Sequence, residues 1–162
     1  MPNAHRFALT ALLVMGSAAL AGLVVAVSTP RYAGARVPVA ASLPWPTSLA
    51  IADRQPPFAL LYVASACEHC SPAAVLVDSA LAAGRLRGFI ASNDERGVAE
   101  AYRAKLHLHR PIVLDSGAAL LHALGTHAVP TLVLFHADGT RQLVVGFRRD
   151  ATYRQVLTEL GR

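Results

Sequence analysis

The sequence predicts an α/β fold, a sandwich in which helices cover a mixed β-sheet, preceded by one transmembrane helix. Three observations predict it: an uncharged amino-terminal stretch, strand-like and helix-like segments that alternate from Phe58 onward, and an Asp-Gly hairpin signal near the carboxyl terminus. Strands that alternate with helices favour parallel pairing, whereas a hairpin adds an antiparallel pair. The two patterns together predict a sheet of mixed direction.

Composition and charge exclude two classes of protein. Hydrophobic residues make up 54% of the 162 residues and charged residues 15%, the reverse of the balance that keeps a chain disordered. The net charge of +5 comes from scattered arginines, and Lys105 is the only lysine. A nucleic-acid-binding face clusters its cations and adds aromatic platforms, so we expect no nucleic-acid partner.

The amino-terminal stretch predicts a membrane anchor. The run from Phe7 to Val27 holds 21 residues without a charge, or about 31 Å of helix, which matches one bilayer core. Residues 7–28 are therefore predicted as a transmembrane helix behind a short cytoplasmic segment, residues 1–6. A cleavable signal peptide is the alternative, because Ala26-Val27-Ser28 resembles a small-residue cleavage site.

Residues 29–57 are predicted as a tether. Six prolines lie within this stretch, and repeated X-Pro bonds favour extended, semi-rigid backbone. Trp45 stands between two of these prolines. It either packs on the following domain or lies near the lipid headgroups.

The domain is expected from Phe58 to Arg162, and its first elements follow from local patterns. Phe58 to Ala64 is a continuous apolar run, typical of a strand buried on both faces. Ser71 to Ala83 predicts a helix, with a proline in its first turn and a glycine after its end. Asp78 is expected on the surface of that helix. Leu86 to Ala91 predicts a second strand.

The next elements alternate in the same way. Asp94 to Leu106 predicts a helix, because acidic residues open it and Arg103 and Lys105 close it, which complements the helix dipole. Ile112 to Leu114 predicts a short strand. Gly117 to Leu124 predicts a short helix that ends at a glycine.

The carboxyl-terminal part predicts a hairpin and a helix. The predicted strands Thr131–His136 and Gln142–Phe147 flank Asp138-Gly139, a strong hairpin signal. Asp150 is a suitable cap for a last helix from Ala151 to Leu160.

The chemistry is concentrated in Cys67-Glu68-His69-Cys70, which contains the only two cysteines of the chain. The motif falls between a predicted buried strand and a predicted helix start, where helix-terminal N–H groups stabilise a thiolate. A structural zinc site needs four Cys or His ligands, normally with a second pair at similar spacing, and no second pair exists in the sequence. A redox-active dithiol is favoured over zinc and over two inert buried thiols, so no metal site is predicted.

The order strand, CxxC, helix, and much later Val129-Pro130-Thr131 opening a strand with an Asp-Gly hairpin, resembles the thioredoxin fold. That fold is a three-layer sandwich around a mixed central sheet. The resemblance covers residues 58–162. The extra helix and strand in about residues 93–125 look like the central insertion of membrane-anchored, TlpA/ResA-like thiol–disulfide oxidoreductases. The resemblance implies an enzyme that exchanges disulfides with proteins, with cytochrome c maturation as one such pathway.

The resemblance also implies residue roles. Cys67 would be the attacking thiol and Cys70 the resolving thiol. Pro130 matches the position of a cis-proline that lies against the dithiol. The backbone of its neighbours, Val129 and Thr131, would pair with an extended substrate segment.

Two residues within the motif are expected to modulate the dithiol. An imidazolium at His69 would stabilise the Cys67 thiolate and raise the reduction potential of the pair, and Glu68 would oppose it. The alternative is that both are solvated loop residues without a catalytic role. Leu61 stands where thioredoxins carry a buried acid, so no general base for Cys70 is evident beyond water or His69.

Two other function classes stay open. A thioredoxin-like copper carrier would use Cys67, Cys70 and one histidine, because soft thiolates select Cu(I). The other histidines of the domain are His107, His109, His122, His127 and His136. An interaction module that keeps the fold without turnover is the third class. No cofactor is predicted for a thiol–disulfide oxidoreductase, the leading hypothesis.

The compartment follows from the tether and the dithiol. A dithiol on a single-span anchor fits a domain held outside the cytoplasmic membrane, where disulfides persist. The resemblance implies the same topology, with the catalytic domain on the periplasmic side. The expected partners are protein dithiol or disulfide substrates and a membrane or periplasmic redox partner.

Overall fold

The structure is a computed structural model, and it describes residues 34–147 and 150–160. The predicted segments 1–6 and 7–28 lie outside the described residues, as does the start of the predicted tether. Among the described residues, no helix combines the length and the apolar character that a bilayer crossing needs.

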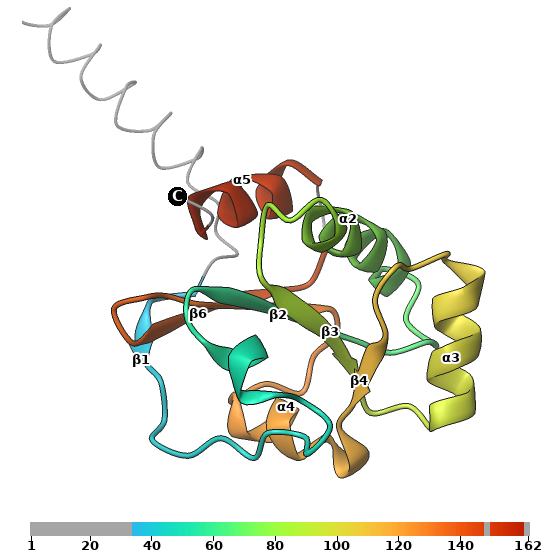
Figure 1. The fold of residues 1–162 in the computed structure, drawn as a ribbon, viewed down its shortest axis with the longest axis horizontal. Helices are drawn as coiled ribbons and strands as arrows, with labels where there is room; N and C mark the ends of the chain where they lie inside the picture. Colours follow the sequence, from blue (N-terminus) through green and yellow to red (C-terminus); the bar gives the residue numbers. More distant parts are fainter. Residues whose placement is uncertain (1–33, 148–149, 161–162) are drawn as a thin grey trace, which may run out of the picture. The chain divides into compact units, whose positions relative to one another are not determined.

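The described chain forms six strands, three longer α-helices, one short α-helix and two 3₁₀ turns (Figure 1). In chain order the elements are β1 (Val37–Pro38), η1 (Ile51–Arg54), β2 (Phe58–Val63), α2 (Cys70–Ala82), β3 (Gly88–Ser92), α3 (Arg96–Lys105), β4 (Ile112–Leu114), η2 (Ser116–Ala118), α4 (Ala119–Ala123), β5 (Thr131–Phe135), β6 (Thr140–Val145) and α5 (Asp150–Leu160). The strands and helices predicted from Phe58 onward are present, with ends that differ by a few residues.

The sheet has mixed direction, as predicted. Its strand order is β1-β6-β5-β2-β3-β4. The strands β2, β3 and β4 run parallel, whereas β5 pairs with β2 and β6 in antiparallel fashion. The central strand β2 therefore has the helix-connected parallel half of the sheet on one side and the hairpin on the other.

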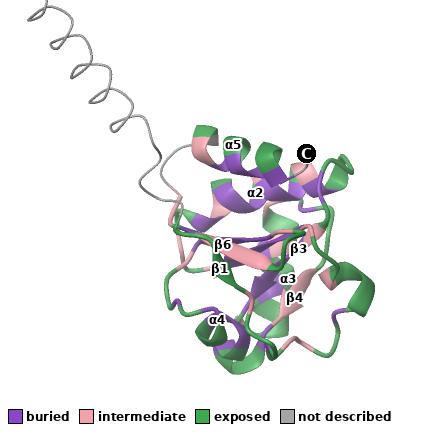
Figure 2. Ribbon diagram, turned by 90° about the vertical axis from the view of Figure 1, so that its left-hand side faces the viewer, coloured by how far each residue is buried: buried purple, intermediate pink, exposed green. Residues whose placement is uncertain are grey.

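The sheet is covered on both faces, so the fold has three layers. All six residues of β2 are buried, and they alternate between two cores. Ala59, Leu61 and Val63 join the core beneath α2 and α5, and Phe58, Leu60 and Tyr62 join the core that includes α4. Figure 1 shows α2 and α5 over one face and α4 over the other, and Figure 2 shows buried residues facing the sheet.

The predicted tether differs from the structure. From Gly34 onward the chain packs on the domain, and a strand that the sequence did not reveal, β1, pairs with β6. Trp45 lies 6.0 Å from Phe58 and 5.6 Å from Phe135, measured between ring centroids. Of the two predicted positions for Trp45, packing on the domain is therefore the one observed. The reason is apolar burial, since the sheet face would otherwise expose its aromatic side chains.

The segment predicted as a central insertion, about residues 93–125, contains α3, β4, η2 and α4. The strand β4 extends the parallel half of the sheet beside β3. Asp115, directly after β4, is 4% exposed and accepts hydrogen bonds from the Tyr62 hydroxyl at 2.7 Å and from the Leu120 N–H at 3.0 Å. These bonds fasten α4 to the central strand.

Candidate active site

The two cysteines lie where the central strand β2 gives way to α2. Their sulfurs are joined in a disulfide, and their Cα atoms are 5.3 Å apart. The Cys67 N–H donates to the Ala64 carbonyl at 3.1 Å, and the Cys70 N–H donates to the Cys67 carbonyl at 3.1 Å. These successive turns place Cys67 outside the helix and Cys70 at its first residue.

Burial makes the two sulfurs unequal. Cys70 is 0% exposed, whereas Cys67 is half-buried. A partner protein can therefore approach Cys67 but not Cys70. This is the asymmetry that attack by one thiol and resolution by the other require.

A loop far away in sequence lies against Cys67. The Sγ atom of Cys67 is 3.7 Å from the carbonyl oxygen of Val129, and the Val129–Pro130 peptide bond is cis. The Pro130 carbonyl accepts the Gly146 N–H at 2.7 Å, which ties the loop to the end of β6. Among the described residues, no backbone carbonyl accepts a hydrogen bond from the Val129 N–H. Pro130 is buried, whereas Val129 is half-buried and has its carbonyl oxygen beside the Cys67 sulfur.

The expectation for Thr131 needs correction. Thr131 is 0% exposed, and its hydroxyl donates to the Ala128 carbonyl at 2.7 Å. It also occupies the first position of β5, between Tyr62 of β2 and Val145 of β6. Because both strand neighbours surround it, Thr131 shapes the loop that carries Val129 and does not face a substrate.

Glu68 and His69 are both exposed. His69 directly precedes α2, and its side chain makes no hydrogen bond to the helix terminus. Leu61, which stands where the resemblance to thioredoxins would place a buried acid, is fully buried in β2. This position is therefore apolar. The structure therefore offers no carboxylate from β2 to take a proton from Cys70.

The remaining histidines do not converge on the dithiol. The rings of His122 and His127 lie 4.6 Å apart, and both residues are exposed. His109 instead contacts Asp78 of α2. Within residues 34–147 and 150–160, no three His, Cys, Asp or Glu side chains are grouped closely enough to hold one metal ion.

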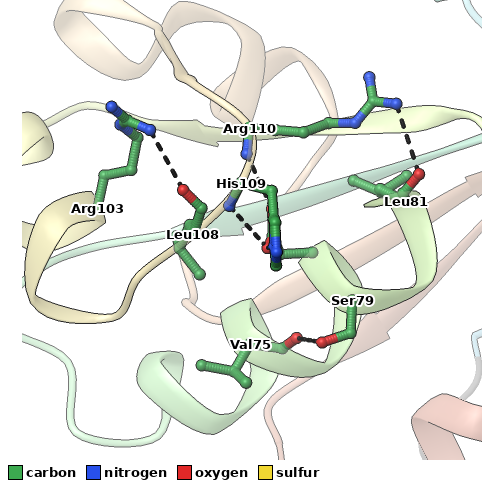
Figure 3. Close-up of polar contacts among 8 residues, drawn as sticks. Val75, Ser79, Leu81, Arg103, Leu108, His109 and Arg110 are labelled. Atoms are coloured by element: carbon green, nitrogen blue, oxygen red, sulfur yellow. Dashed lines mark hydrogen bonds and ion pairs between the residues drawn. The ribbon is translucent and has the colours of Figure 1, made fainter. Parts of the chain in front are cut away.

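Asp78 is not the surface residue that the sequence predicted. It is 2% exposed and accepts three hydrogen bonds: from the His109 N–H at 2.9 Å, the His109 ring Nδ1 at 2.7 Å and the Arg110 N–H at 3.1 Å. Burial alone raises the pKa of the Asp78 carboxyl, but these bonds outweigh it, so the pKa lies below its ordinary 3.8. Figure 3 shows His109 and Arg110 lying against α2, with the Arg110 guanidinium reaching the Leu81 carbonyl.

One polar residue near the dithiol had no expected role. Asp94, half-buried after β3, accepts the N–H of Ser65, two residues before Cys67, at 2.8 Å. A signal for it does exist in the sequence: Asp94 follows the carboxyl end of a parallel strand, and that edge of an α/β sheet is where sites are built. The bond itself joins residues 29 positions apart, which no local pattern reveals.

Similar structures share this fold. A secreted disulfide oxidoreductase of Mycobacterium tuberculosis, homologous to E. coli DsbE, is 17% identical with a TM-score of 0.54, covering 63% of this chain and 80% of that one. A thiol:disulfide interchange protein of the thioredoxin family from Chlorobium tepidum is 16% identical, with a TM-score of 0.54 over 65% and 79%. The exposed lipoprotein thioredoxin Etrx1 of Streptococcus pneumoniae is 18% identical, with a TM-score of 0.54 over 64% and 84%.

No protein-family model and no curated protein matches the sequence. At identities below 20%, the property that these three structures share with this chain is the fold. The domain therefore has the thioredoxin-like fold, with its mixed sheet and its cysteine pair between a central strand and the following helix.

Proposed function

We propose that the chain is a thiol–disulfide oxidoreductase that exchanges disulfides with protein substrates through Cys67 and Cys70. The observation that carries the proposal is the unequal burial of the two sulfurs beside the loop of Val129 and cis-Pro130. Structures described as a disulfide oxidoreductase and as a thiol:disulfide interchange protein share the fold, which supports this chemistry.

The exchange runs in two steps. In the reducing direction, the Cys67 thiolate attacks a substrate disulfide, one substrate sulfur leaves as a thiolate, and a mixed disulfide forms. The Cys70 thiolate then attacks the Cys67 sulfur and releases the second substrate thiolate. The substrate gains two electrons, and Cys67 and Cys70 lose them to form the disulfide of the structure. The oxidising direction reverses both steps.

A substrate segment would be held by backbone pairing. The Val129 carbonyl oxygen lies beside Cys67 Sγ, and an extended peptide that pairs with the Val129 backbone would place its own disulfide near that sulfur. Main-chain bonds of this kind supply affinity with little demand on sequence. The proposed substrates are therefore extended segments of proteins that carry a disulfide or a dithiol.

The proposal is tested by a redox titration of Cys67–Cys70 and by an exchange assay with a disulfide-bonded protein. We expect a defined two-electron potential and catalysis that depends on both cysteines. We also propose cytochrome c maturation as the pathway. An apocytochrome c peptide that carries its CxxCH cysteines as a disulfide is the substrate that tests it. A Cys67–Cys70 pair that exchanges no disulfide with any protein would leave the copper carrier and the interaction module as the remaining function classes.

The proposed setting is a single-pass anchor, with the domain on the periplasmic side next to a membrane or periplasmic redox partner. The uncharged residues 7–27 support the anchor. We expect the full chain to stay with membranes through a high-salt wash and to need detergent for release. A mature protein that begins near Thr29 and stays in the soluble fraction would show cleavage instead.

The copper-carrier alternative is tested on the same preparation. Two thiolates already bind Cu(I), so a Cu(I) titration of the reduced protein against a competing chelator is compared with that of a variant that lacks a candidate histidine. The rings of His122 and His127 contact each other. His127 lies three residues before Pro130, so a His127→Ala variant asks whether its ring completes a Cu(I) site with the two thiolates. Tight binding by the wild type that His127→Ala loses would favour the carrier.

Glu68 and His69 are expected to modulate the reduction potential of the Cys67–Cys70 pair. His69→Ala should lower the reduction potential of the pair by about 10–30 mV, because an imidazolium beside Cys67 favours the thiolate and hence the reduced state. Glu68→Ala should raise it by less. Redox titrations of both variants against glutathione, at pH 5.5 and pH 8, measure the effect. Equal potentials for His69→Ala and the wild type at both pH values would show that the dipeptide does not tune the site.

A further inference from the structure

The connection between β3 and α3 reaches the loop that carries the dithiol. Asp94 Oδ2 accepts the Ser65 N–H at 2.8 Å and the Ser92 hydroxyl at 2.9 Å, and the Ser92 Oγ in turn accepts the Asp94 N–H at 3.1 Å. Ser92 is 1% exposed at the end of β3, where it lies beside Val63 of β2. The carboxylate is thus anchored on a buried residue of the neighbouring strand.

The Ser65 N–H belongs to the turn that connects β2 to the dithiol. Ser65 lies inside the turn closed by the bond from the Cys67 N–H to the Ala64 carbonyl at 3.1 Å. The direction in which this turn leaves β2 sets the position of the Cys67 sulfur relative to α2 and to Val129. A hydrogen bond to a carboxylate is roughly twice as strong as one between neutral groups, so Asp94 restrains the turn more firmly than a neutral acceptor would.

The same segment also contacts the other side of the dithiol. The Tyr102 hydroxyl of α3 donates to Ser71 Oγ, the residue after Cys70, at 3.4 Å, and Tyr102 is 6% exposed. Burial raises the pKa of the Tyr102 hydroxyl, and the charge of Asp94 raises it further. Asp94 therefore contacts the backbone before Cys67, and Tyr102 contacts the Ser71 side chain after Cys70.

We infer that Asp94 is a positioning residue for the dithiol: its carboxylate holds the Ala64–Cys67 turn in the orientation that keeps the Cys67 thiolate at the amino-terminal end of α2. The inference rests on the proposed function and assigns part of the site to a residue outside the CxxC motif. Asp94 need not touch the sulfurs for this role.

A positioning role and a purely electrostatic role of Asp94 predict opposite changes in the alkylation rate of Cys67. A carboxylate acting only through its charge would oppose the Cys67 thiolate, so its removal would speed alkylation of Cys67. A carboxylate that positions the turn supports the thiolate, because a displaced sulfur loses the N–H groups at the helix start. Asp94→Ala removes both the acceptor and the charge, whereas Asp94→Asn removes the charge and keeps an acceptor oxygen for Ser65.

The test measures the alkylation rate of Cys67 in the reduced protein against pH, in a Cys70→Ser background. We expect Asp94→Ala to react on the order of tenfold more slowly at pH 7, with a raised thiol pKa. Asp94→Asn should stay within about twofold of the Asp94 parent in that background. Asp138→Ala is the matched control, because Asp138 also accepts a backbone N–H and a hydroxyl, both from Thr140, but lies in the turn beyond the far end of β5.

Two results would overturn the inference: faster alkylation in both Asp94 variants, which would indicate a charge effect alone, or rates equal to the Asp138→Ala control in both. If Asp94→Ala does not fold, Ser92→Ala takes its place, since it removes only the hydroxyl that anchors Asp94 and should slow alkylation in the same direction. Alkylation needs no protein substrate. A wild type that alkylates normally but exchanges no protein disulfide would therefore contradict the proposed function and leave the role of Asp94 standing.

Discussion

Cys67→Ser is expected to abolish disulfide exchange, and Cys70→Ser to stop it one step later. Without Cys67 the accessible attacking sulfur is lost, and Cys70 is 0% exposed, so turnover should fall by about 10³-fold or more. With Cys70→Ser, the attack still occurs, but no thiol resolves the mixed disulfide. Incubation with a disulfide-bonded substrate, followed by acid quenching and mass spectrometry, should trap a stable adduct in Cys70→Ser alone.

The order of alkylation gives an independent check on the same assignment. In the reduced wild type, Cys67 should be modified before Cys70, with an apparent pKa below the roughly 8.5 of a free thiol. The double variant with serine at both positions serves as the blank for trapping and alkylation. Equal reactivity of the two cysteines, or adduct formation by Cys67→Ser, would contradict the proposed division of roles.

Asp78→Ala is expected to cause the largest loss of stability among substitutions of the polar residues of α2. The substitution leaves the N–H groups of His109 and Arg110 without their acceptor on α2 and should lower the free energy of unfolding by about 2–4 kcal/mol. His109→Ala should cost less, because it removes only the ring contact and keeps both backbone donors. Urea denaturation followed by circular dichroism measures the free energy of unfolding of the wild type, Asp78→Ala and His109→Ala.

A carboxylate on the neighbouring helix provides the control. Glu100 is exposed on α3, so Glu100→Ala should change the free energy of unfolding by no more than about 0.5 kcal/mol. If Asp78→Ala were as stable as Glu100→Ala, the loop of residues 107–111 would not depend on this carboxylate for its attachment to α2.

The pH dependence of Asp78 has a defined sign. The pKa of this carboxyl is lowered in the folded state, chiefly by the hydrogen bonds from His109 and Arg110 acting against burial. Its stabilising contribution is therefore complete above the ordinary value of 3.8 and is lost as the pH falls through the lower, folded value. Asp78→Asn should lack this acid-dependent component, so its stability should change less than that of the wild type between pH 5 and pH 2.

Much of the fold could be predicted from local patterns. The apolar run of β2, the CxxC motif before α2 and the Asp-Gly turn between β5 and β6 each depend on neighbouring residues, through periodicity, helix-end chemistry and turn geometry. Their order along the chain indicated both the mixed sheet and the position of the cysteine pair. The amino-terminal part of the domain was harder to predict, because the two-residue strand β1 is too short to show a period and the prolines around it are typical of a linker.

Burial of single polar residues could not be predicted in the same way. Asp78 lies at helical spacing from the buried Cys70 and Ala74, but a carboxylate is rarely buried at such a position. Here a loop more than 30 residues away supplies the hydrogen-bond donors that burial of the carboxylate requires. Thr131 follows the proline of a recognisable motif, yet β2 and β6 enclose it. A side chain's surroundings depend on which element covers it, and the sequence of its own element does not contain that information.

The sequence by itself determined the chemistry of this protein: two thiols at a spacing that closes into a disulfide, between a buried strand and a helix start. These features are local, because a helix terminus and a three-residue separation act over a few ångströms. Only the tertiary structure decided which distant groups surround the thiols. Val129 arrives from 62 residues away, and Asp94 reaches the turn before Cys67 from 29 residues away. They meet because the carboxyl ends of β2 and β3 and the start of β5 share one edge of the sheet, and strand pairing across the whole chain creates that edge.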